Sequence, residues 1–339
     1  MADPTNLLIV APFEDAQIAA LRKRFPSVNI NHHPNIMEET IPEDLWQNTD
    51  ILYTHRVLPL AELVPNLRWV QFHYAGLDAY QDHALFQRED LQFTTLSGAN
   101  AIQTAEHALA LILALAHNVP TMLSDQSRSK WSARRLERYV PTELYGKTVG
   151  IVGYGSVGTL LARMLQGFQV KVLASKRELL DAEDEGYRGT DIQGLDADFV
   201  ERLYPGRAMK SMFKDCDFVV ITVPLTNETE GLVSGPQLAA LPPSAFLVDV
   251  SRGGVLDHEA LIEALKQETF AGAALDVFPE EPLPADSPLW DMPNVLISPH
   301  VAGLSPSYGE RAMALLTENL DRFLAGEELL NRYDSERGY

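Results

Sequence analysis

The sequence predicts an α/β protein with parallel sheets, divided into two domains. Short apolar stretches alternate with helical stretches along the first hundred residues, and this order favours parallel strands with helices on both faces of a sheet. In the middle of the chain an apolar strand runs into the glycine-rich sequence 153–158, and a helical stretch follows. The length of 339 residues is typical of two domains.

Hydrophobic periodicity places the elements of the N-terminal part. Strands are expected at 7–10, 28–30, 51–53 and 69–72, and an amphipathic helix is expected at 14–25. Residues 104–118 are apolar nearly all round. This stretch therefore predicts a long helix that is buried between layers or domains.

The second half of the chain repeats the alternation. Strands are expected at 149–152, 218–221, 245–248, 271–275 and 295–297, with helices at 159–166 and 307–325. The long polar connection 178–214 is interpreted as an exposed excursion in preference to a functional lid. The polar tail 331–339 is expected to be loose.

Composition and charge limit the class of protein. Apolar residues make up 46% and charged residues 22% of the chain, as in soluble globular proteins. The net charge of −20 leaves no basic stripe for nucleic acid or an anionic membrane. The longest apolar run, 108–116, is too short to cross a bilayer, and residues 1–6 show no basic leader segment. Because Cys216 is the single cysteine, no internal disulfide can form, and a cytoplasmic location is expected.

The glycine-rich sequence has the spacing of a phosphate cradle. Gly153 allows a tight turn, Gly155 lets the backbone approach a pyrophosphate, and Gly158 lets the helix pack close to the strand. The N-terminus of the helix then directs free N–H groups and a positive dipole end at the phosphates. The sequence therefore predicts a dinucleotide site, and it predicts no metal site.

Three further motifs place charged side chains after expected strands. Arg252 follows the strand at 245–248, at the edge where open α/β sheets bind ligands, and its guanidinium can pair with a carboxylate. Asp276 follows the next strand, and Glu281 lies in the proline-bounded loop beyond it. His300 follows the last strand, and a neighbouring carboxylate can raise the pKa of its imidazole. An Arg, a Glu, a His and a nucleotide cradle make one coherent site.

These motifs together resemble the D-isomer-specific 2-hydroxyacid dehydrogenase family over nearly the whole chain. The resemblance is carried by the glycine motif and by five further segments in matching order and spacing: Ser-Arg-Gly-Gly-x-x-Asp at 251–257, Asp-Val-Phe-x-x-Glu-Pro at 276–282, Pro-His-x-Ala-Gly at 299–303, and the upstream segments 75–78 and 100–108.

The resemblance implies two doubly wound, Rossmann-like domains with the active site in the cleft between them. The substrate domain, flavodoxin-like, would be residues 1–103 plus 304–339, and the dinucleotide-binding domain residues 104–303. It also implies a homodimer formed through the cofactor domains, and a small 2-oxo or 2-hydroxy acid as substrate.

The resemblance also assigns roles to residues. His300 looks like the general acid/base, Glu281 like the partner that keeps it protonated, and Arg252 like the anchor of the substrate carboxylate and carbonyl. Backbone N–H groups of Tyr74, Ala75, Gly76 and Leu77 would bind the substrate carboxylate. The implied cofactor contacts are Gly153, Gly155, Ser156, Val157, Gly158, Ser175, Lys176, Arg177, Val223, Pro224, Val250, Ser251, Asp276 (at the nicotinamide end) and Ala302.

The residues about 18 positions beyond the last glycine of the cradle, around position 176, indicate which dinucleotide binds. NAD-preferring members of this fold carry an acidic residue there, which meets the ribose hydroxyls. This chain has Ser175, Lys176 and Arg177 instead. Because cations pair with a 2′-phosphate and a carboxylate repels it, NADP is expected to be favoured over NAD.

Several functions stay open at this point. The substrate could be glyoxylate or hydroxypyruvate, or a larger aliphatic or aromatic 2-oxo acid, and a phosphoglycerate dehydrogenase is a further alternative. Arg56, His73, Tyr74 and Trp131 are candidates for the side-chain pocket, although each is interpreted first as structural. A formate dehydrogenase is disfavoured because those relatives have Gln where this chain has Glu281. The second class of function is a dinucleotide-sensing binding module like the C-terminal-binding-protein corepressors.

Overall fold

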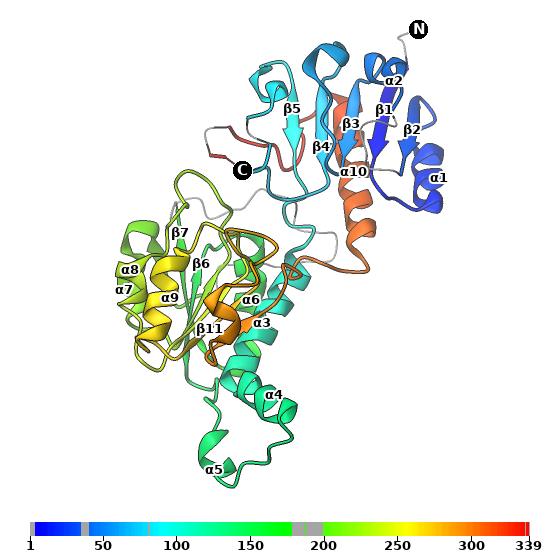
Figure 1. Cartoon of the computed structure of the whole chain (residues 1–339). Coiled ribbons are helices and arrows are strands. Elements are labelled where there is room, and N and C mark those ends of the chain that lie inside the picture. The colour runs from blue at the N-terminus through cyan, green and yellow to red at the C-terminus, as the bar shows by residue number, and fades with distance from the viewer. Residues whose placement is uncertain are drawn as a thin grey trace. The chain divides into compact units, whose positions relative to one another are not determined.

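The computed structural model describes residues 4–34, 41–80, 82–177, 187, 199–335 and 337–338. The chain divides into two compact units, each built on one sheet (Figure 1). The first unit contains the residues up to Asn100 and those from Ser305 onward, together with Tyr187. The second contains the described residues from Ala101 to Leu304, apart from Tyr187.

The first unit has a five-stranded sheet in the order β2-β1-β3-β4-β5, with every neighbouring pair parallel. This is the flavodoxin-like strand order. Its strands are β1 (Thr5–Val10), β2 (Val28–His33), β3 (Ile51–Thr54), β4 (Trp69–Phe72) and β5 (Gln92–Thr94), and its helices are α1 (Asp15–Arg24), α2 (Glu43–Gln47) and α10 (Tyr308–Ala325). The expected strands and helices are confirmed; β5, only three residues long, was missed.

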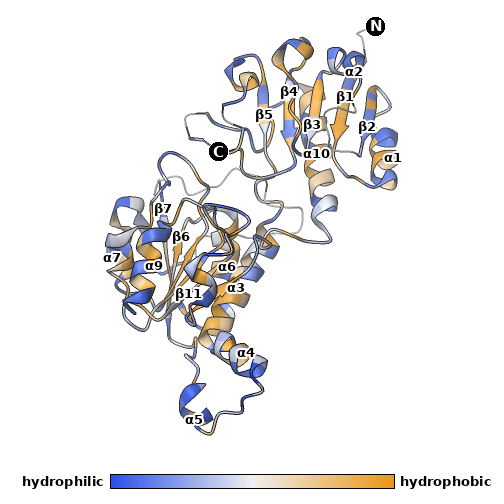
Figure 2. Cartoon of the chain, viewed as in Figure 1, coloured by the Kyte–Doolittle hydropathy of each residue, from blue (hydrophilic) through white to orange (hydrophobic). Residues whose placement is uncertain are grey.

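Apolar side chains cover both faces of this sheet. One cluster joins β1 and β3 to α1 and α10, and it includes Leu7, Ile9 and Leu316. The other cluster, on the opposite face, includes Leu8, Val10 and Trp46. Figure 2 shows β1 and β3 as largely hydrophobic ribbons. Because neighbouring strand residues point to opposite faces, a continuous apolar run can fill both layers.

The expectation of a loose C-terminal tail is wrong for residues 331–333. The Asn331 side chain donates to the carbonyls of Thr95 (3.2 Å) and Ser97 (2.8 Å), and the Tyr333 amide donates to the Phe93 carbonyl (2.9 Å). Polar groups of this segment therefore form hydrogen bonds with the backbone around β5.

The second unit has a seven-stranded parallel sheet in the order β12-β11-β10-β9-β6-β7-β8. The strands are β6 (Thr148–Val152), β7 (Lys171–Lys176), β8 (Arg202–Pro205), β9 (Phe218–Ile221), β10 (Phe246–Asp249), β11 (Gly272–Leu275) and β12 (Val295–Ile297). The helices are α3 (Ala101–Ala116), α4 (Val119–Ser127), α5 (Arg135–Arg138), α6 (Ser156–Leu165), α7 (Met209–Phe213), α8 (Gly235–Leu238) and α9 (His258–Lys266). Short 3-10 helices in the chain are Ala61–Leu63, Ala84–Gln87, Gln166–Phe168, Gly206–Ala208 and Pro288–Asp291. The order of the first six strands is that of a Rossmann fold.

The predicted helix at 104–118 is confirmed as α3, but its expected burial on every side is wrong. Ala105, Ala108 and Ile112 are fully buried in the core shared with α6. Ala110 is exposed, and Leu113 is only partly buried. Apolar composition alone therefore does not tell which face of this helix packs on the sheet.

The expectation of an exposed excursion is wrong for residues 199–214. Arg202–Pro205 forms β8, which pairs with β7 at the edge of the sheet, and Met209, Met212 and Phe213 of α7 are buried in the core. Apart from Tyr187, residues 178–198 lie outside the described residues.

Helices α4 and α5 project from the body of the second unit (Figure 1). Asp125 of α4 joins them, because its carboxylate accepts hydrogen bonds from Arg138 (2.8 Å) and Tyr139 (2.5 Å). These hydrogen bonds hold the pKa of Asp125 down at about 2. In the described ranges no single helix is long and apolar enough to cross a membrane; α3 and α4 meet that criterion only as a pair, bent by 69°.

Candidate active site

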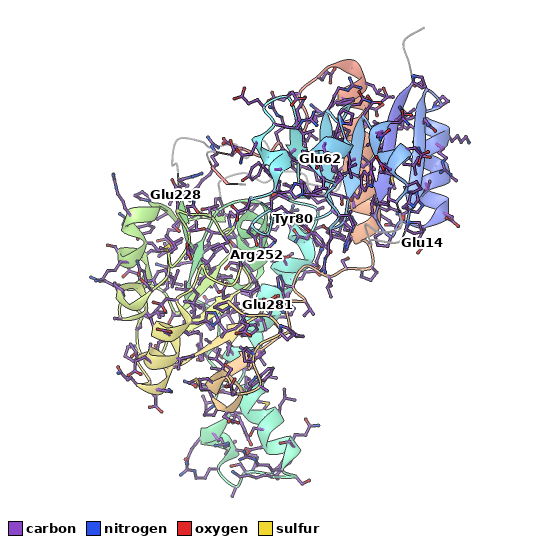
Figure 3. All side chains as sticks on the ribbon, turned by 45° about the horizontal axis from the view of Figure 1, so that its top comes forward. Glu14, Glu62, Tyr80, Glu228, Arg252 and Glu281 are labelled. Atoms are coloured by element: carbon purple, nitrogen blue, oxygen red, sulfur yellow. The ribbon has the colours of Figure 1, made fainter. Side chains whose placement is uncertain are left out.

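The candidate site of the second unit lies along the carboxyl ends of its strands. The strand order reverses between β6 and β9, which is where open α/β sheets bind nucleotides. The loops after β6, β7, β9, β10, β11 and β12 reach this edge. The predicted cofactor and catalytic residues lie in these loops, at the end of β7 (Ser175 and Lys176) or in the first turn of α6. Figure 3 labels Arg252 and Glu281 among them. Among the described residues no cluster of His, Cys, Asp or Glu could hold a metal ion.

The glycine cradle has the close packing that its spacing predicts. Gly153 has a φ of +99°, and a Cβ there would lie 2.7 Å from Val223. A Cβ at Gly158 would overlap the carbonyl oxygen of Gly153, so the helix can approach the strand only with glycine here. Helix α6 begins at Ser156, directly after Gly155, and its first amides face the loop side of the sheet.

The Arg252 turn packs directly on the next loop of the sheet edge. A Cβ at Gly253 would overlap the Phe278 carbonyl and approach Pro279 to 2.8 Å. Arg252 itself donates from Nη1 to the Ser251 carbonyl (2.8 Å). The close approach at Gly253 therefore brings the Arg252 turn against the loop that continues to Glu281.

His300 and Glu281 form an ion pair. His300 Nδ1 lies 2.7 Å from Glu281 Oε2, and the other carboxylate oxygen, Oε1, accepts the Phe278 amide (3.0 Å). Both side chains remain accessible, at 42% and 35%. With Nδ1 held by Glu281, Nε2 is the nitrogen that faces away from the pair and can exchange a proton with a ligand. His300 also has a φ of +52°, a conformation that side chains other than glycine seldom adopt.

Asp276 fixes the loop that carries His300. Its buried carboxylate accepts hydrogen bonds from the amides of Val301 (3.0 Å) and Ala302 (2.9 Å) and from the Ser298 hydroxyl (2.6 Å). Burial raises the pKa of Asp276, but these bonds and the nearby His107 outweigh it and lower the pKa to about 2. The predicted nicotinamide contact is therefore an ionised residue with a structural role of its own.

The predicted adenosine end contains an ion pair that sequence reasoning missed. Ser175 is buried within β7, and its carbonyl accepts the Gly153 amide (3.1 Å). Arg177, directly after β7, pairs with Glu228 at 2.7 Å. Glu228 lies in the loop after β9, a short way beyond the predicted contacts Val223 and Pro224, and it is labelled in Figure 3.

The predicted substrate loop belongs to the first unit. Tyr74, Ala75 and Gly76 follow β4 and are half-buried, and Leu77 is buried. The Tyr74 hydroxyl hydrogen-bonds the His55 ring at the end of β3.

His73, a candidate for the side-chain pocket, lies in the core of the first unit. It is 8% exposed and bonds the Tyr53 hydroxyl (2.6 Å) through Nδ1. Burial lowers the pKa of His73 to about 4, so it stays neutral at physiological pH. Trp131, another candidate, is 87% exposed and belongs to the second unit, between α4 and α5.

Residues 109–302 match the family model described as D-isomer specific 2-hydroxyacid dehydrogenase, NAD binding domain. The chain belongs to the D-isomer-specific 2-hydroxyacid dehydrogenase family. It is 35% identical over 271 residues to a glyoxylate reductase of Pyrococcus furiosus, a match that covers 78% of this chain and 75% of the relative. It is 33% identical over 264 residues to glyoxylate/hydroxypyruvate reductase B of Pectobacterium carotovorum, with 78% of each covered.

Solved structures of this family have the same fold. A D-isomer-specific 2-hydroxyacid dehydrogenase from Xanthobacter autotrophicus Py2, in complex with NADPH and MES, matches with a TM-score of 0.79 and 29% identity over the whole of both chains. A family member from Aeromonas salmonicida matches with a TM-score of 0.80 and 27% identity, over 98% of this chain and 99% of the other. The predicted family, the two parallel-sheet units and the class of activity, an oxidoreductase of 2-hydroxy acids that uses NAD(P), are thereby confirmed.

Other charged or titratable residues near this sheet edge were not predicted from the sequence as members of the site. Glu228 is 51 positions from Arg177, and His107 of α3 lies 3.0 Å from the Ser298 hydroxyl although 191 positions separate them. Asp249, at the end of β10, was not predicted as a site residue either. Only the folded sheet brings these groups to one edge.

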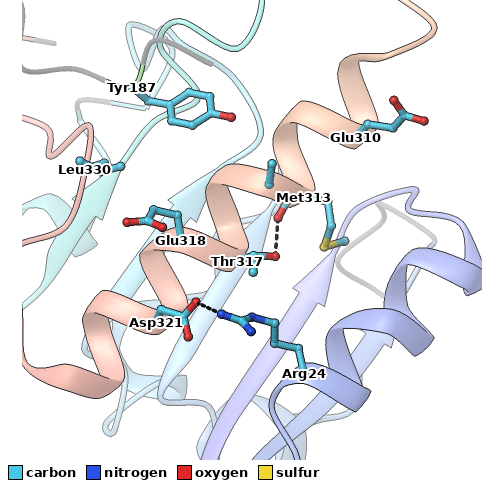
Figure 4. A pocket seen from close by; sticks show the side chains of 9 residues that line it. Arg24, Tyr187, Glu310, Met313, Thr317, Glu318, Asp321 and Leu330 are labelled. Carbon is cyan, nitrogen blue, oxygen red and sulfur yellow. Dashed lines mark hydrogen bonds and ion pairs between the residues drawn. The ribbon is translucent and has the colours of Figure 1, made fainter. Parts of the chain in front are cut away.

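A cavity of about 570 Å³ lies elsewhere, on the first unit between α1 and α10 (Figure 4). Glu310, Glu318 and Asp321 line it, and the single cation in its lining, Arg24, already pairs with Asp321 at 2.9 Å. None of the predicted site residues lines this cavity. An acidic lining does not suit a 2-oxo acid, which carries a negative charge.

We expect Gly158→Ala to weaken binding of NADPH and NADH at least tenfold, a loss of about 1.4 kcal/mol. The added methyl group displaces either the Gly153 carbonyl or the start of α6, and with it the phosphate amides. Titration of nicotinamide fluorescence measures the dissociation constants. Gly167→Ala is the matched control, because no heavy atom lies within 4 Å of the added carbon. Equal affinity in the two variants would contradict the role of the cradle.

Proposed function

We propose that this dehydrogenase is a reductase of small 2-oxo acids in which His300 is the general acid/base, Glu281 its partner and Arg252 the substrate anchor. The observation that carries the proposal is the His300–Glu281 pair at 2.7 Å, in the loops next to the Arg252 turn. Residues 104–303 would bind the dinucleotide, and residues 1–103 plus 304–339 the substrate. In the reverse direction the same groups oxidise a D-2-hydroxy acid.

The chain's own residues supply protons, positioning and charge. A bound nicotinamide cofactor would supply the hydride that C2 of the 2-oxo acid accepts. Protonated His300 gives its Nε2 proton to the carbonyl oxygen as that hydride arrives, so the product is a neutral alcohol. Glu281 stabilises the imidazolium before transfer, because its carboxylate is fixed by the Phe278 amide. Arg252 holds the substrate carboxylate and stabilises charge on the carbonyl oxygen.

The substrate loop would complete the anchoring. The N–H groups of residues 74–77 follow β4, at the carboxyl edge of the first unit's sheet, where parallel sheets bind ligands. Amides there can bind a carboxylate without a cation.

Small 2-oxo acids are the substrates that the relatives favour. The curated relatives from Pyrococcus furiosus and Pectobacterium carotovorum are named glyoxylate reductase and glyoxylate/hydroxypyruvate reductase B. The narrower proposal for this chain is therefore glyoxylate or hydroxypyruvate. The corepressor-like alternative has no support among these relatives, which are named as enzymes.

NADP is the proposed preferred cofactor. Lys176 ends β7 and Arg177 follows it, at the position where NAD-binding sites carry an acid, and the Xanthobacter relative was solved with NADPH. Glu228 opposes this preference, because it already neutralises Arg177 and would repel a 2′-phosphate. The proposal is that two cations outweigh one carboxylate, with Glu228 reducing the margin.

A homodimer is the proposed assembly. The projecting α4–α5 segment exposes apolar side chains to 42–87%: Met122, Leu123, Trp131, Leu136 and Val140. The Asp125 ion pair and hydrogen bonds hold this segment in shape, so the exposure is a feature of an ordered surface. Ordered apolar surface of this kind favours association with a second copy.

The proposed location is the cytoplasm. Cys216, the single cysteine, is buried and donates to the Met212 carbonyl, and burial raises the pKa of its thiol to about 12. A structural thiol of this kind suits a reducing compartment. Fractionation of the native cells tests the location.

A spectrophotometric screen of 2-oxo acids with both reduced cofactors tests the activity. We expect turnover of glyoxylate or hydroxypyruvate, and a fall in kcat of about two to four orders of magnitude for His300→Ala, the size of a lost general acid. His117→Ala is the matched control, since this residue is exposed at the end of α3. Full activity of His300→Ala would refute its assignment, and an absence of turnover with every acid would favour a binding module.

The cofactor preference is tested at Glu228. We expect Glu228→Gln to raise kcat/KM for NADPH up to about fivefold, the most an exposed ion pair usually supplies, with little change for NADH. Lys176→Asp should shift the preference towards NADH. Glu230→Gln, an exposed neighbour with the same change of charge, is the control. A clearly higher kcat/KM of the wild type for NADH than for NADPH would contradict the NADP proposal.

The assembly is tested by sedimentation velocity. We expect twice the mass of one chain for the wild type, and dissociation for Leu136→Asp, which places a charge on the exposed apolar surface. Leu324→Asp, on α10, adds the same charge to an exposed leucine outside that surface and should keep the dimer. A monomeric wild type would overturn the proposal.

A further inference from the structure

Asp249 is a buried acid that the proposed mechanism does not use. It is the last residue of β10, three positions before Arg252, and its side chain is fully buried. In the sheet register it lies opposite Ile221 of β9 and Leu275 of β11. The carboxyl group is therefore enclosed in the middle of the sheet between apolar strands.

Only one of the two carboxyl oxygens of Asp249 accepts hydrogen bonds from the described residues. Oδ1 accepts from the Ser251 amide (3.0 Å) and from the Ser251 hydroxyl (2.5 Å). Oδ2 is buried and has no partner among the described residues. An ionised carboxylate accepts bonds at both oxygens, and a buried charge without such bonds is strongly unfavourable. The arrangement is that of a neutral carboxylic acid.

The charged groups on the neighbouring elements do not compensate a negative charge on Asp249. After β11 comes Asp276, which is ionised and repels it; His107 of α3 lies against Asp276. Strand β9 contributes only the apolar residues Phe218–Ile221. Helix α9 packs on the sheet face that Asp249 shares with Leu247. It begins at His258, whose buried imidazole is neutral. Arg252 directs Nη1 at the Ser251 carbonyl, and no ion pair within the described ranges reaches Asp249.

The titration of Asp249 agrees with this geometry. Burial raises the pKa of Asp249, the two Ser251 bonds lower it and Asp276 raises it, and the net value is about 7. The acid therefore loses its proton within the range in which an enzyme works.

Ser251 connects this acid to the substrate anchor. Its amide and hydroxyl donate to Asp249, and its carbonyl accepts the Arg252 guanidinium. We propose that Asp249 is a positioning residue that holds the Arg252 turn as a neutral acid, and that the turn loosens when ionisation places an uncompensated charge at the buried Oδ2. The inference rests on the proposed function only for the role of Arg252.

The first test is thermal unfolding without cofactor or substrate, followed from pH 4.5 to pH 8. The folded chain holds the Asp249 proton more tightly than the unfolded chain, whose pKa is about 3.9. The proton therefore stabilises the fold at low pH, and this contribution is lost as the pH rises from about 4 through about 7. We expect the Tm of the wild type to fall over this range relative to Asp249→Asn, a neutral isostere. Asp286→Asn, at an exposed acid, should follow the wild type.

The second test separates KM from kcat. If ionised Asp249 releases Arg252, KM for the 2-oxo acid in the wild type rises about tenfold between pH 6 and pH 8, since the protonated fraction falls by about that factor around a pKa of 7. In Asp249→Asn this rise is absent, whereas the pH dependence of every other group affects both enzymes alike. The change in kcat should be smaller than the change in KM, because Arg252 binds the substrate carboxylate.

The outcomes are distinguishable. Equal pH dependence of Tm in the wild type and Asp249→Asn would show that Asp249 carries no proton, and would overturn the inference. A tenfold KM rise that persists in Asp249→Asn would overturn the positioning role. Absence of turnover in every variant would count against the proposed function, and the unfolding curves, which need no ligand, would still decide the protonation of Asp249.

Discussion

Asp276 joins the three strands on which the candidate site depends, through its backbone and through its ionised carboxylate. Its amide donates to the Asp249 carbonyl of β10 (2.9 Å), and its own carbonyl accepts the His300 amide (2.8 Å). Its side chain meanwhile holds the amides of Val301 and Ala302. Because those bonds keep its pKa near 2, the carboxylate stays charged over the whole range in which a histidine titrates. The support that Asp276 gives to the His300 loop therefore does not change over that range, as the proposed acid/base role of His300 requires.

Close packing between loops then couples the proposed anchor to the proposed acid. The Arg252 turn touches the Phe278 backbone at Gly253, and the Phe278 amide holds Glu281, which holds His300. The first and last of these contacts join loops of consecutive strands, so the parallel register of β10, β11 and β12 sets the spacing of the groups. A rigid sheet edge of this kind needs little reorganisation when substrate binds, which is how positioning contributes to rate.

Sequence patterns predicted most of this fold because its central strands are continuous apolar runs and its glycines have fixed spacing. They failed at β8, whose sequence Arg-Leu-Tyr-Pro is short and polar and is ordered by pairing with β7. They failed also at residues 331–333, whose partners are backbone groups far away in the chain. At the site, the residue types were predictable from the motifs, but Glu228 was not, because its relation to Arg177 exists only in the folded sheet.

Asp249 and Asp276 show why a residue type alone does not determine charge. Asp249 ends β10, Asp276 directly follows the neighbouring strand β11, and both side chains are buried. By the alternation along the strands their side chains lie on opposite faces of the sheet, Asp276 towards His107 of α3 and Asp249 towards the cluster that contains Leu247. Asp276 receives donors at both oxygens, whereas Asp249 receives donors from a single serine. The number of donors that the adjoining loop supplies decides which acid keeps its proton, so one sheet edge holds a permanent charge under the His300 loop and a titratable acid under the Arg252 turn.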